Sequence, residues 1–162
     1  MSGWRKALGV GLLLLTLGVG AEVRAEVRPF VSGSLEQIQS ERAGKPFILA
    51  LWSASCTHCP AELKALGQLL KRTPGLEVVL VATDTPAEAA QLARLAAEYG
   101  LGRQPQWVFA DEQAERLRFQ LDRRWYGELP RTYLYDRQHR REGHSGLIPA
   151  AQLERWLAAN VK

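Results

Sequence analysis

Hydrophobic and polar positions fall into two alternating kinds of segment from residue 34 onwards. The runs at 46–52 and 76–82 are almost wholly apolar, which is typical of strands buried on both faces. Segment 57–72 instead places leucines three and four positions apart, which predicts an amphipathic helix. The same patterns and their Gly and Pro boundaries predict further helices at 34–43, 86–99 and 111–123, strands at 105–110, 131–136 and 141–145, and a last helix opening at Pro149.

This order of elements predicts an α/β fold. Two strands joined through a helix form a parallel pair, because a parallel connection needs a crossover. The short connection between 131–136 and 141–145 instead predicts a hairpin, which adds an antiparallel edge. We therefore predict one domain with a mixed central sheet flanked by helices.

The first 25 residues follow a different pattern. A basic start precedes an apolar run of about 15 residues that ends at Ala21, and small residues follow. That order is typical of a secretory signal peptide, and the run is shorter than the roughly 18 residues that span a bilayer. We expect residues 1–25 to be a signal peptide cleaved after Ala21 or Ala25, and 26–162 to be the folded domain. An uncleaved segment that tethers the domain is the alternative, and both place the domain outside the cytoplasm.

The charge of the chain argues against a nucleic-acid partner. The formal net charge is +4, and it falls to +2 without residues 1–25, because that segment holds three basic residues and one acidic residue. The arginines of the remaining chain are interspersed with acidic and apolar residues, whereas a nucleic-acid groove needs clustered basic side chains.

Cys56 and Cys59 are the only cysteines, and they lie where the strand 46–52 meets the helix 57–72. A disulfide across two residues would constrain the unfolded chain little, so a purely structural bridge is disfavoured. A metal site would need further ligands, and the chain offers His58, His139 and His144. A copper carrier that uses the cysteine pair and a histidine therefore stays open as an alternative.

Redox chemistry fits the position of the pair best. A cysteine at the start of a helix faces unpaired N–H groups and the positive end of the helix dipole. Both favour thiolate over thiol, and the thiolate is the nucleophile in disulfide exchange. Cys59, one turn further, is near enough to resolve a mixed disulfide.

Two stretches carry a resemblance to a known family. LWSASCTHCPAEL at 51–63 and GELPRTYLYD at 127–136 resemble the thioredoxin-fold thiol:disulfide oxidoreductases, and within them the extracytoplasmic TlpA/ResA-like branch. The resemblance covers about residues 34–161. It implies a thioredoxin-like fold, with 105–123 as the strand–helix insertion typical of the branch.

The resemblance also implies roles for single residues. Cys56 would be the attacking thiol and Cys59 the resolving one. Pro130 would follow a cis peptide bond against the cysteine pair, and Leu129 would offer its backbone to a bound chain. Glu62 matches an acidic residue of the family.

Glu62 shares a helix face with Cys59 and could pass a proton to or from its thiol. An ordinary acid near a helix start is the alternative reading of Glu62. Thr57 and His58, between the cysteines, are expected to tune the redox potential. Ser55 replaces a usual Trp, which predicts a more open rim, and Glu128 places a charge near the expected groove.

The function implied is that of an extracytoplasmic thiol-disulfide oxidoreductase without a cofactor or metal, because the electrons sit on sulfur. We expect its partners to be protein thiols or disulfides of the periplasm, with a membrane electron donor that keeps it reduced. A monomer and reductase-type work, rather than strong oxidase work, are expected.

Overall fold

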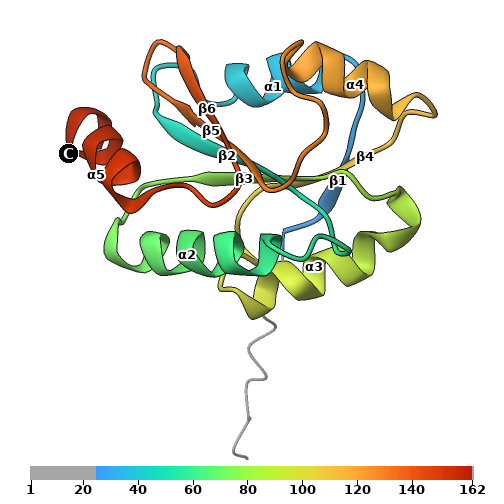
Figure 1. Ribbon diagram of the computed structural model, residues 1–162, viewed down its shortest axis with the longest axis horizontal. Coiled ribbons are helices and arrows are strands. Elements are labelled where there is room, and N and C mark those ends of the chain that lie inside the picture. Colours follow the sequence, from blue (N-terminus) through green and yellow to red (C-terminus); the bar gives the residue numbers. More distant parts are fainter. Residues whose placement is uncertain (1–24, 162) are drawn as a thin grey trace, which may run out of the picture.

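The computed structural model describes residues 25–161, so all of the expected signal peptide except Ala25 lies outside the described residues. A sheet lies between two layers of helices (Figure 1). The strands are β1 Val27–Phe30, β2 Phe47–Trp52, β3 Val78–Ala82, β4 Gln106–Phe109, β5 Arg131–Tyr135 and β6 Arg141–Ser145. The helices are α1 Ser34–Ser40, α2 Cys59–Arg72, α3 Ala89–Glu98, α4 Ala114–Leu121 and α5 Ala150–Asn160, with the 3-10 turn η1 Pro86–Glu88 before α3.

The sheet has the order β1-β4-β3-β2-β5-β6. The neighbours β1 and β4, β4 and β3, and β3 and β2 are parallel. β5 runs antiparallel to β2, and β6 antiparallel to β5. The predicted mixed sheet with a hairpin edge is therefore confirmed.

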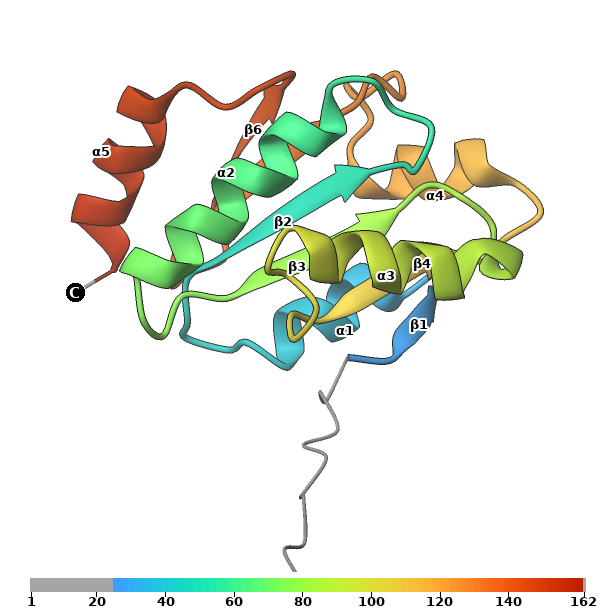
Figure 2. The ribbon, with the colours of Figure 1, turned by 90° about the horizontal axis from the view of Figure 1, so that it is seen from below.

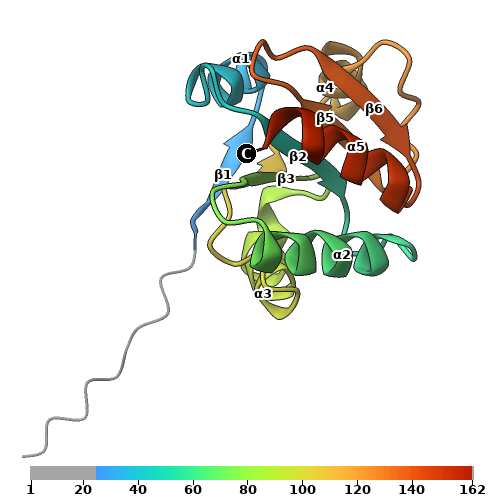
Figure 3. The ribbon, with the colours of Figure 1, turned by 90° about the vertical axis from the view of Figure 1, so that its left-hand side faces the viewer.

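β2 lies inside the sheet, and its alternate side chains enter two separate cores. Ile48, Ala50 and Trp52 pack with apolar residues of α2, α3 and α5, whereas Leu49 and Leu51 pack with those of α1 and α4. Figure 2, which views the molecule from below, shows α2 and α3 side by side in front of the sheet, and Figure 3 shows α1 and α4 on the other face. Burial on both faces explains why β2 reads as a continuous apolar run.

One strand, β1, and some element boundaries differ from those predicted. β1 is a four-residue strand that pairs with β4 at the edge of the sheet. It contains Pro29, which usually argues against a strand but is tolerated at an edge. Segment 105–123, expected as an insertion, folds as β4 and α4, and α4 is shorter than the helix predicted at 111–123.

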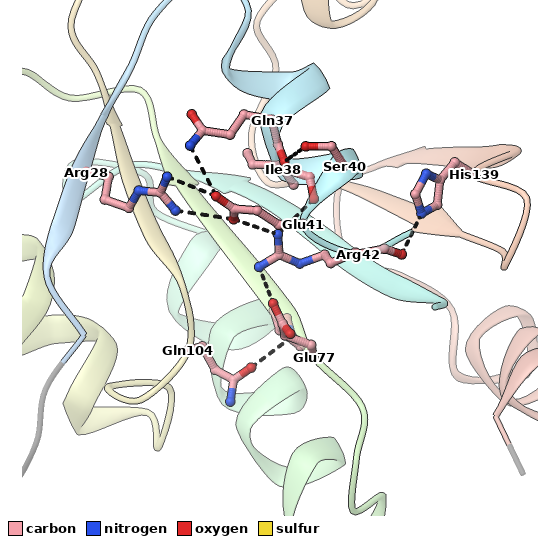
Figure 4. Close-up of polar contacts among 10 residues, drawn as sticks. Arg28, Gln37, Ile38, Ser40, Glu41, Arg42, Glu77, Gln104 and His139 are labelled. Carbon is pink, nitrogen blue, oxygen red and sulfur yellow. Dashed lines mark hydrogen bonds and ion pairs between the residues drawn. The ribbon is translucent and has the colours of Figure 1, made fainter. Parts of the chain in front are cut away.

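A polar network attaches β1 and α1 to the sheet near the start of β2 (Figure 4). Arg28 donates two hydrogen bonds to Glu41, at 3.3 and 3.0 Å. These hydrogen bonds lower the pKa of Glu41. Burial raises this pKa, but the hydrogen bonds and the charges of Arg28 and Arg42 outweigh it. The buried Arg42 also pairs with Glu77 and donates to the carbonyl of Ile38 at 2.8 Å.

Across residues 25–161, the structure contains no helix with the length and apolar character needed to cross a membrane.

Candidate active site

The cysteine pair lies where the chain leaves the end of β2 and enters α2. Cys56 and Cys59 form a disulfide. Cys59 is completely buried and Cys56 is partly exposed. The backbone N–H of Cys59 donates to Sγ of Cys56 at 3.1 Å. Of the two cysteines, only Cys56 is therefore accessible to solvent, and the backbone N–H of the first residue of α2 donates to its sulfur.

The helix predicted at 57–72 begins two residues later than expected. α2 begins at Cys59, and His58 is its N-cap. The backbone N–H of Cys56 instead bonds to the carbonyl of Ser53 at 3.2 Å, which closes a turn before the helix. The start of the helix still favours a thiolate at Cys56, because the N–H that donates to its sulfur belongs to the first residue of α2.

Asp84 holds the loop that precedes Cys56. Its carboxylate accepts hydrogen bonds from the backbone N–H of Ala54, at 3.1 and 3.3 Å to its two oxygens, and from the hydroxyl of Ser53 at 3.1 Å. Asp84 was not among the predicted site residues; it follows β3 and lies 28 positions after Cys56. Its position just beyond the carboxyl end of a parallel strand next to β2 was the available signal.

A surface groove of about 590 Å³ borders the cysteine pair. The groove takes in Thr57, His58 and Leu129, which sequence analysis had assigned to the site. Its lining residues are Ser53, Ser55, Cys56, Thr57, His58, Thr83, Asp84, Gly127 and Leu129.

The peptide bond between Leu129 and Pro130 is cis, as expected from the resemblance. Pro130 is buried and its carbonyl accepts the N–H of Gly146 at 2.8 Å. Leu129 contacts both cores and lines the groove with Cys56. The two segments that carry the resemblance therefore meet at this groove.

Glu62 lies in the first turn of α2 and is only 2% exposed. The hydroxyl of Thr132 donates to Oε1 at 2.8 Å, and the backbone N–H of Ile148 donates to Oε2 at 3.1 Å. A carboxylate buried on the helix of Cys59 is thus supported by two donors from distant segments. Glu62 was among the predicted site residues, whereas Thr132 and Ile148 were not.

Ser55 and Glu128, the two departures from the family pattern, differ in whether they line the groove. Ser55 is exposed and lines the groove, where its hydroxyl lies 3.0 Å from that of Ser53. Glu128 does not line the groove, because its carboxylate accepts the hydroxyl of Ser145 at 2.5 Å and the N–H of Tyr126 at 3.1 Å. Burial raises the pKa of Glu128, but these hydrogen bonds outweigh it and lower the pKa overall.

The structure does not bring the histidines and cysteines into a metal cluster. Among the described residues, no group of three or more His, Cys, Asp or Glu side chains is placed to hold a metal ion. His139 lies 3.0 Å from the carbonyl of Arg42, and His144 lies 3.0 Å from the carbonyl of Leu147. These contacts are those of ordinary hairpin residues.

Solved structures of similar fold are thiol-disulfide proteins. A secreted disulfide oxidoreductase of Mycobacterium tuberculosis, homologous to E. coli DsbE, is 21% identical with a TM-score of 0.57, covering 74% of this chain and 85% of its own. A putative thiol:disulfide interchange protein DsbE from Chlorobium tepidum is 24% identical with a TM-score of 0.55, covering 74% and 82%. A thiol-disulfide isomerase from Corynebacterium glutamicum is 16% identical with a TM-score of 0.61, covering 76% and 85%. These likenesses confirm the predicted thioredoxin-like fold.

A comparison with curated proteins found no significant match. Residues 30–140 match the model of the AhpC/TSA family. The matched segment contains both cysteines, Glu62 and the cis peptide bond, so it includes the whole groove. The chain therefore belongs to the AhpC/TSA family, in agreement with the predicted resemblance to thioredoxin-fold oxidoreductases.

Proposed function

We propose that this protein is an extracytoplasmic thiol:disulfide oxidoreductase that reduces disulfides of partner proteins. The observation that carries the proposal is the asymmetry of the cysteine pair. Cys56 borders an open groove and receives a helix N–H on its sulfur, whereas Cys59 is buried behind it. An attacking thiolate needs access and electrostatic support, and a resolving thiol needs only to reach the first sulfur.

The reaction proceeds by two exchanges. In the reduced protein, the thiolate of Cys56 attacks one sulfur of the partner's disulfide, so a mixed disulfide forms and the second partner sulfur leaves as a thiolate. The thiolate of Cys59 then attacks Sγ of Cys56, which restores the Cys56–Cys59 disulfide and releases the first partner sulfur. The partner gains two electrons and the protein loses two. The protons of the two protein thiols balance those taken up by the partner.

Glu62 serves the second exchange in this scheme. Cys59 must lose its proton before it attacks, and solvent does not reach a fully buried thiol. Glu62 lies three positions further along α2, at a spacing that places two side chains on one helix face. Its carboxylate takes up the proton and is held in place by Thr132 and Ile148.

Leu129 and Pro130 belong to the proposed substrate site, and of the two Leu129 lines the groove. Leu129 precedes the cis bond and lines the groove together with Cys56. An extended partner segment that enters the groove pairs with backbone groups of Leu129. Thr57 and His58 border the same groove and adjust the balance between thiol and disulfide.

The charges at the groove favour a reductant over a strong oxidant. The carboxylate of Asp84 bonds to Ala54, two residues before Cys56, which places a negative charge within about 10 Å of the attacking sulfur. A negative charge at that range disfavours the thiolate, makes the dithiol less stable and so makes the couple more reducing. His58 acts the other way, so we propose an intermediate potential.

The location follows from residues 1–25, which we propose to be removed as a signal peptide on export to the periplasm. The N–H of Ala25 bonds to the carbonyl of Gly102 at 2.8 Å, so cleavage after Ala21 keeps a contact that cleavage after Ala25 removes. A membrane donor would return electrons to the disulfide, and the protein would act as a monomer.

Trapping of the mixed disulfide tests the proposal. Cys59→Ser cannot complete the second exchange, so it should accumulate covalent complexes with partner proteins that dissolve on addition of dithiothreitol. Cys56→Ser is the matched control and should trap none. Equal trapping by the two variants, or none by Cys59→Ser, would contradict the assigned roles.

A further inference from the structure

The segment that ends in the cis-proline is closed into a loop by the residues at its two ends. Asp122 follows α4, and its Oδ2 accepts a hydrogen bond from Nη2 of Arg131, the first residue of β5, at 3.1 Å. The hydroxyl of Tyr133 donates to the same oxygen at 3.1 Å. Asp122 is 8% exposed. We call residues 122–131 the cis-proline loop.

The end of β6 holds this loop from a second side. Nη1 of Arg131 donates to the hydroxyl oxygen of Ser145 at 2.7 Å, and that hydroxyl donates in turn to Glu128 at 2.5 Å. The N–H of Gly146 bonds to the carbonyl of Pro130. Arg131, Ser145 and Glu128 thus form one chain of hydrogen bonds that starts at Asp122.

Glu128 also fixes the tip of the loop. Its carbonyl accepts the indole N–H of the buried Trp125 at 2.8 Å, and its carboxylate accepts the backbone N–H of Tyr126 at 3.1 Å. The backbone on both sides of Tyr126 is therefore set by bonds inside the loop. Gly127, the next residue, lines the groove beside Cys56.

The side chain of Tyr126 is left in solvent by this arrangement. It is 92% exposed, the largest value among the exposed large hydrophobic residues of the described chain. A tyrosine on a fixed backbone loses little conformational freedom on binding, and tyrosines are enriched among residues that dominate binding energy. Its ring offers an apolar face and its hydroxyl a hydrogen bond.

We propose that Tyr126 contacts the partner polypeptide beside its reacting cysteine, and that Asp122 and Glu128 are positioning residues that hold Tyr126 there. This inference rests on the proposed function and names the partner chemistry: an apolar or aromatic side chain close to the partner's disulfide. A small disulfide lacks such a side chain and gains nothing from Tyr126.

The inference is tested by comparing two substrates in steady-state assays with dithiothreitol as electron donor. Insulin is the polypeptide disulfide, and oxidised glutathione is the small disulfide. Tyr126→Ala should raise KM for insulin roughly fivefold or more, the effect of losing a dominant contact, with kcat unchanged. Its rate with oxidised glutathione should equal that of the wild type. Tyr126→Phe keeps the ring and should restore most of the affinity.

Phe119 supplies the matched control, because it is another exposed aromatic residue, on α4. Its ring is 57% exposed and is covered by the guanidinium of Arg123, 5.0 Å from the ring centre. Phe119→Ala should leave KM for insulin unchanged. Asp122→Asn should raise KM in the same direction as Tyr126→Ala, and the double variant should add little further, because both changes act through one contact.

An unchanged KM in Tyr126→Ala overturns the inference, as does a slower reaction of that variant with glutathione. A wild-type KM in Asp122→Asn overturns the positioning role of Asp122. Failure of the proposed function has a different signature, since the wild-type protein would then reduce neither insulin nor glutathione in a manner that depends on Cys56.

Discussion

The hydroxyl of Thr132 donates a 2.8 Å hydrogen bond to the carboxylate of Glu62, although 70 residues separate the two along the chain. Thr132 is completely buried and lies two residues after the cis-proline, while Glu62 lies in the first turn of α2, three residues after Cys59. One bond thus joins α2, the helix that begins at Cys59, to β5, the strand that follows the cis-proline loop.

Thr132→Val should destabilise the fold. The change keeps the shape of the side chain but removes a donor to a buried carboxylate, which costs about 1 to 3 kcal/mol. Urea unfolding of the oxidised protein measures this loss. Thr83→Val is the control, because the hydroxyl of Thr83 makes only a 3.5 Å contact with the carbonyl of Trp52. Equal losses in the two variants would contradict the prediction.

Glu62→Gln should slow release of the partner more than attack on it. The amide cannot take up the proton of Cys59, so mixed disulfides should persist for longer and the dependence of the rate on pH should change. Single-turnover kinetics from pH 5 to 9 measure both effects. Glu88→Gln is the control, because Glu88 caps η1 and does not lie on α2, the helix of Cys59. An unchanged pH–rate profile would return Glu62 to a purely structural role.

The two thiols should differ in reactivity once the disulfide is reduced. Cys56 borders the groove and Cys59 has no exposed surface, so iodoacetamide near neutral pH should alkylate Cys56 first. Mass spectrometry of the peptides after brief labelling gives the order. Preferential labelling of Cys59 would reverse the assigned roles.

Asp84→Asn and His58→Ala should move the reduction potential in opposite directions. Loss of the negative charge at Asp84 stabilises the thiolate of Cys56 and makes the couple more oxidising, whereas loss of the imidazole makes it more reducing. A shift of about 30 mV corresponds to about 1.4 kcal/mol for this two-electron couple. Equilibration with glutathione buffers measures both. Shifts of the same sign would contradict the electrostatic account.

Acid should weaken the fold partly through Asp122. Burial raises the pKa of this carboxyl, but the N–H of Arg124, the hydroxyl of Tyr133 and nearby arginines lower it below its usual 3.8. A group with a depressed pKa stabilises the fold above the unfolded pKa, and that stability is lost as pH falls through the folded value. Unfolding free energy should therefore fall less between pH 7 and pH 3 in Asp122→Asn than in the wild type. Glu112→Gln, at an exposed residue, should keep the wild-type difference.

Local patterns were enough to predict the central strands, the helices and the cysteine site. β2 and β3 are apolar throughout because they are buried on both faces, and α2 carries its leucines at helical spacing. β1 escaped prediction because four residues with a proline hold little pattern, and its strand geometry comes from pairing with β4.

The polar partners of the site could not be predicted in the same way. Asp84, Thr132 and Asp122 are ordinary polar residues in the sequence, and their roles arise only when distant segments meet. The family resemblance supplied the cis bond at Pro130 and the identity of Glu62, but it carried no information about the hydrogen bonds that hold them. Such bonds are properties of the packed chain rather than of a motif.

The central position of β2 also determines how the protein unfolds when heated. Strands at the edges, such as β6, can open locally, whereas β2 is paired on both sides and completely buried. Amide hydrogens of such a strand exchange with solvent only when the whole domain opens. The amide hydrogens of β2, the strand that leads to Cys56, should therefore be among the slowest-exchanging of the molecule. Redox activity should accordingly persist up to the global melting transition and not decline at lower temperatures.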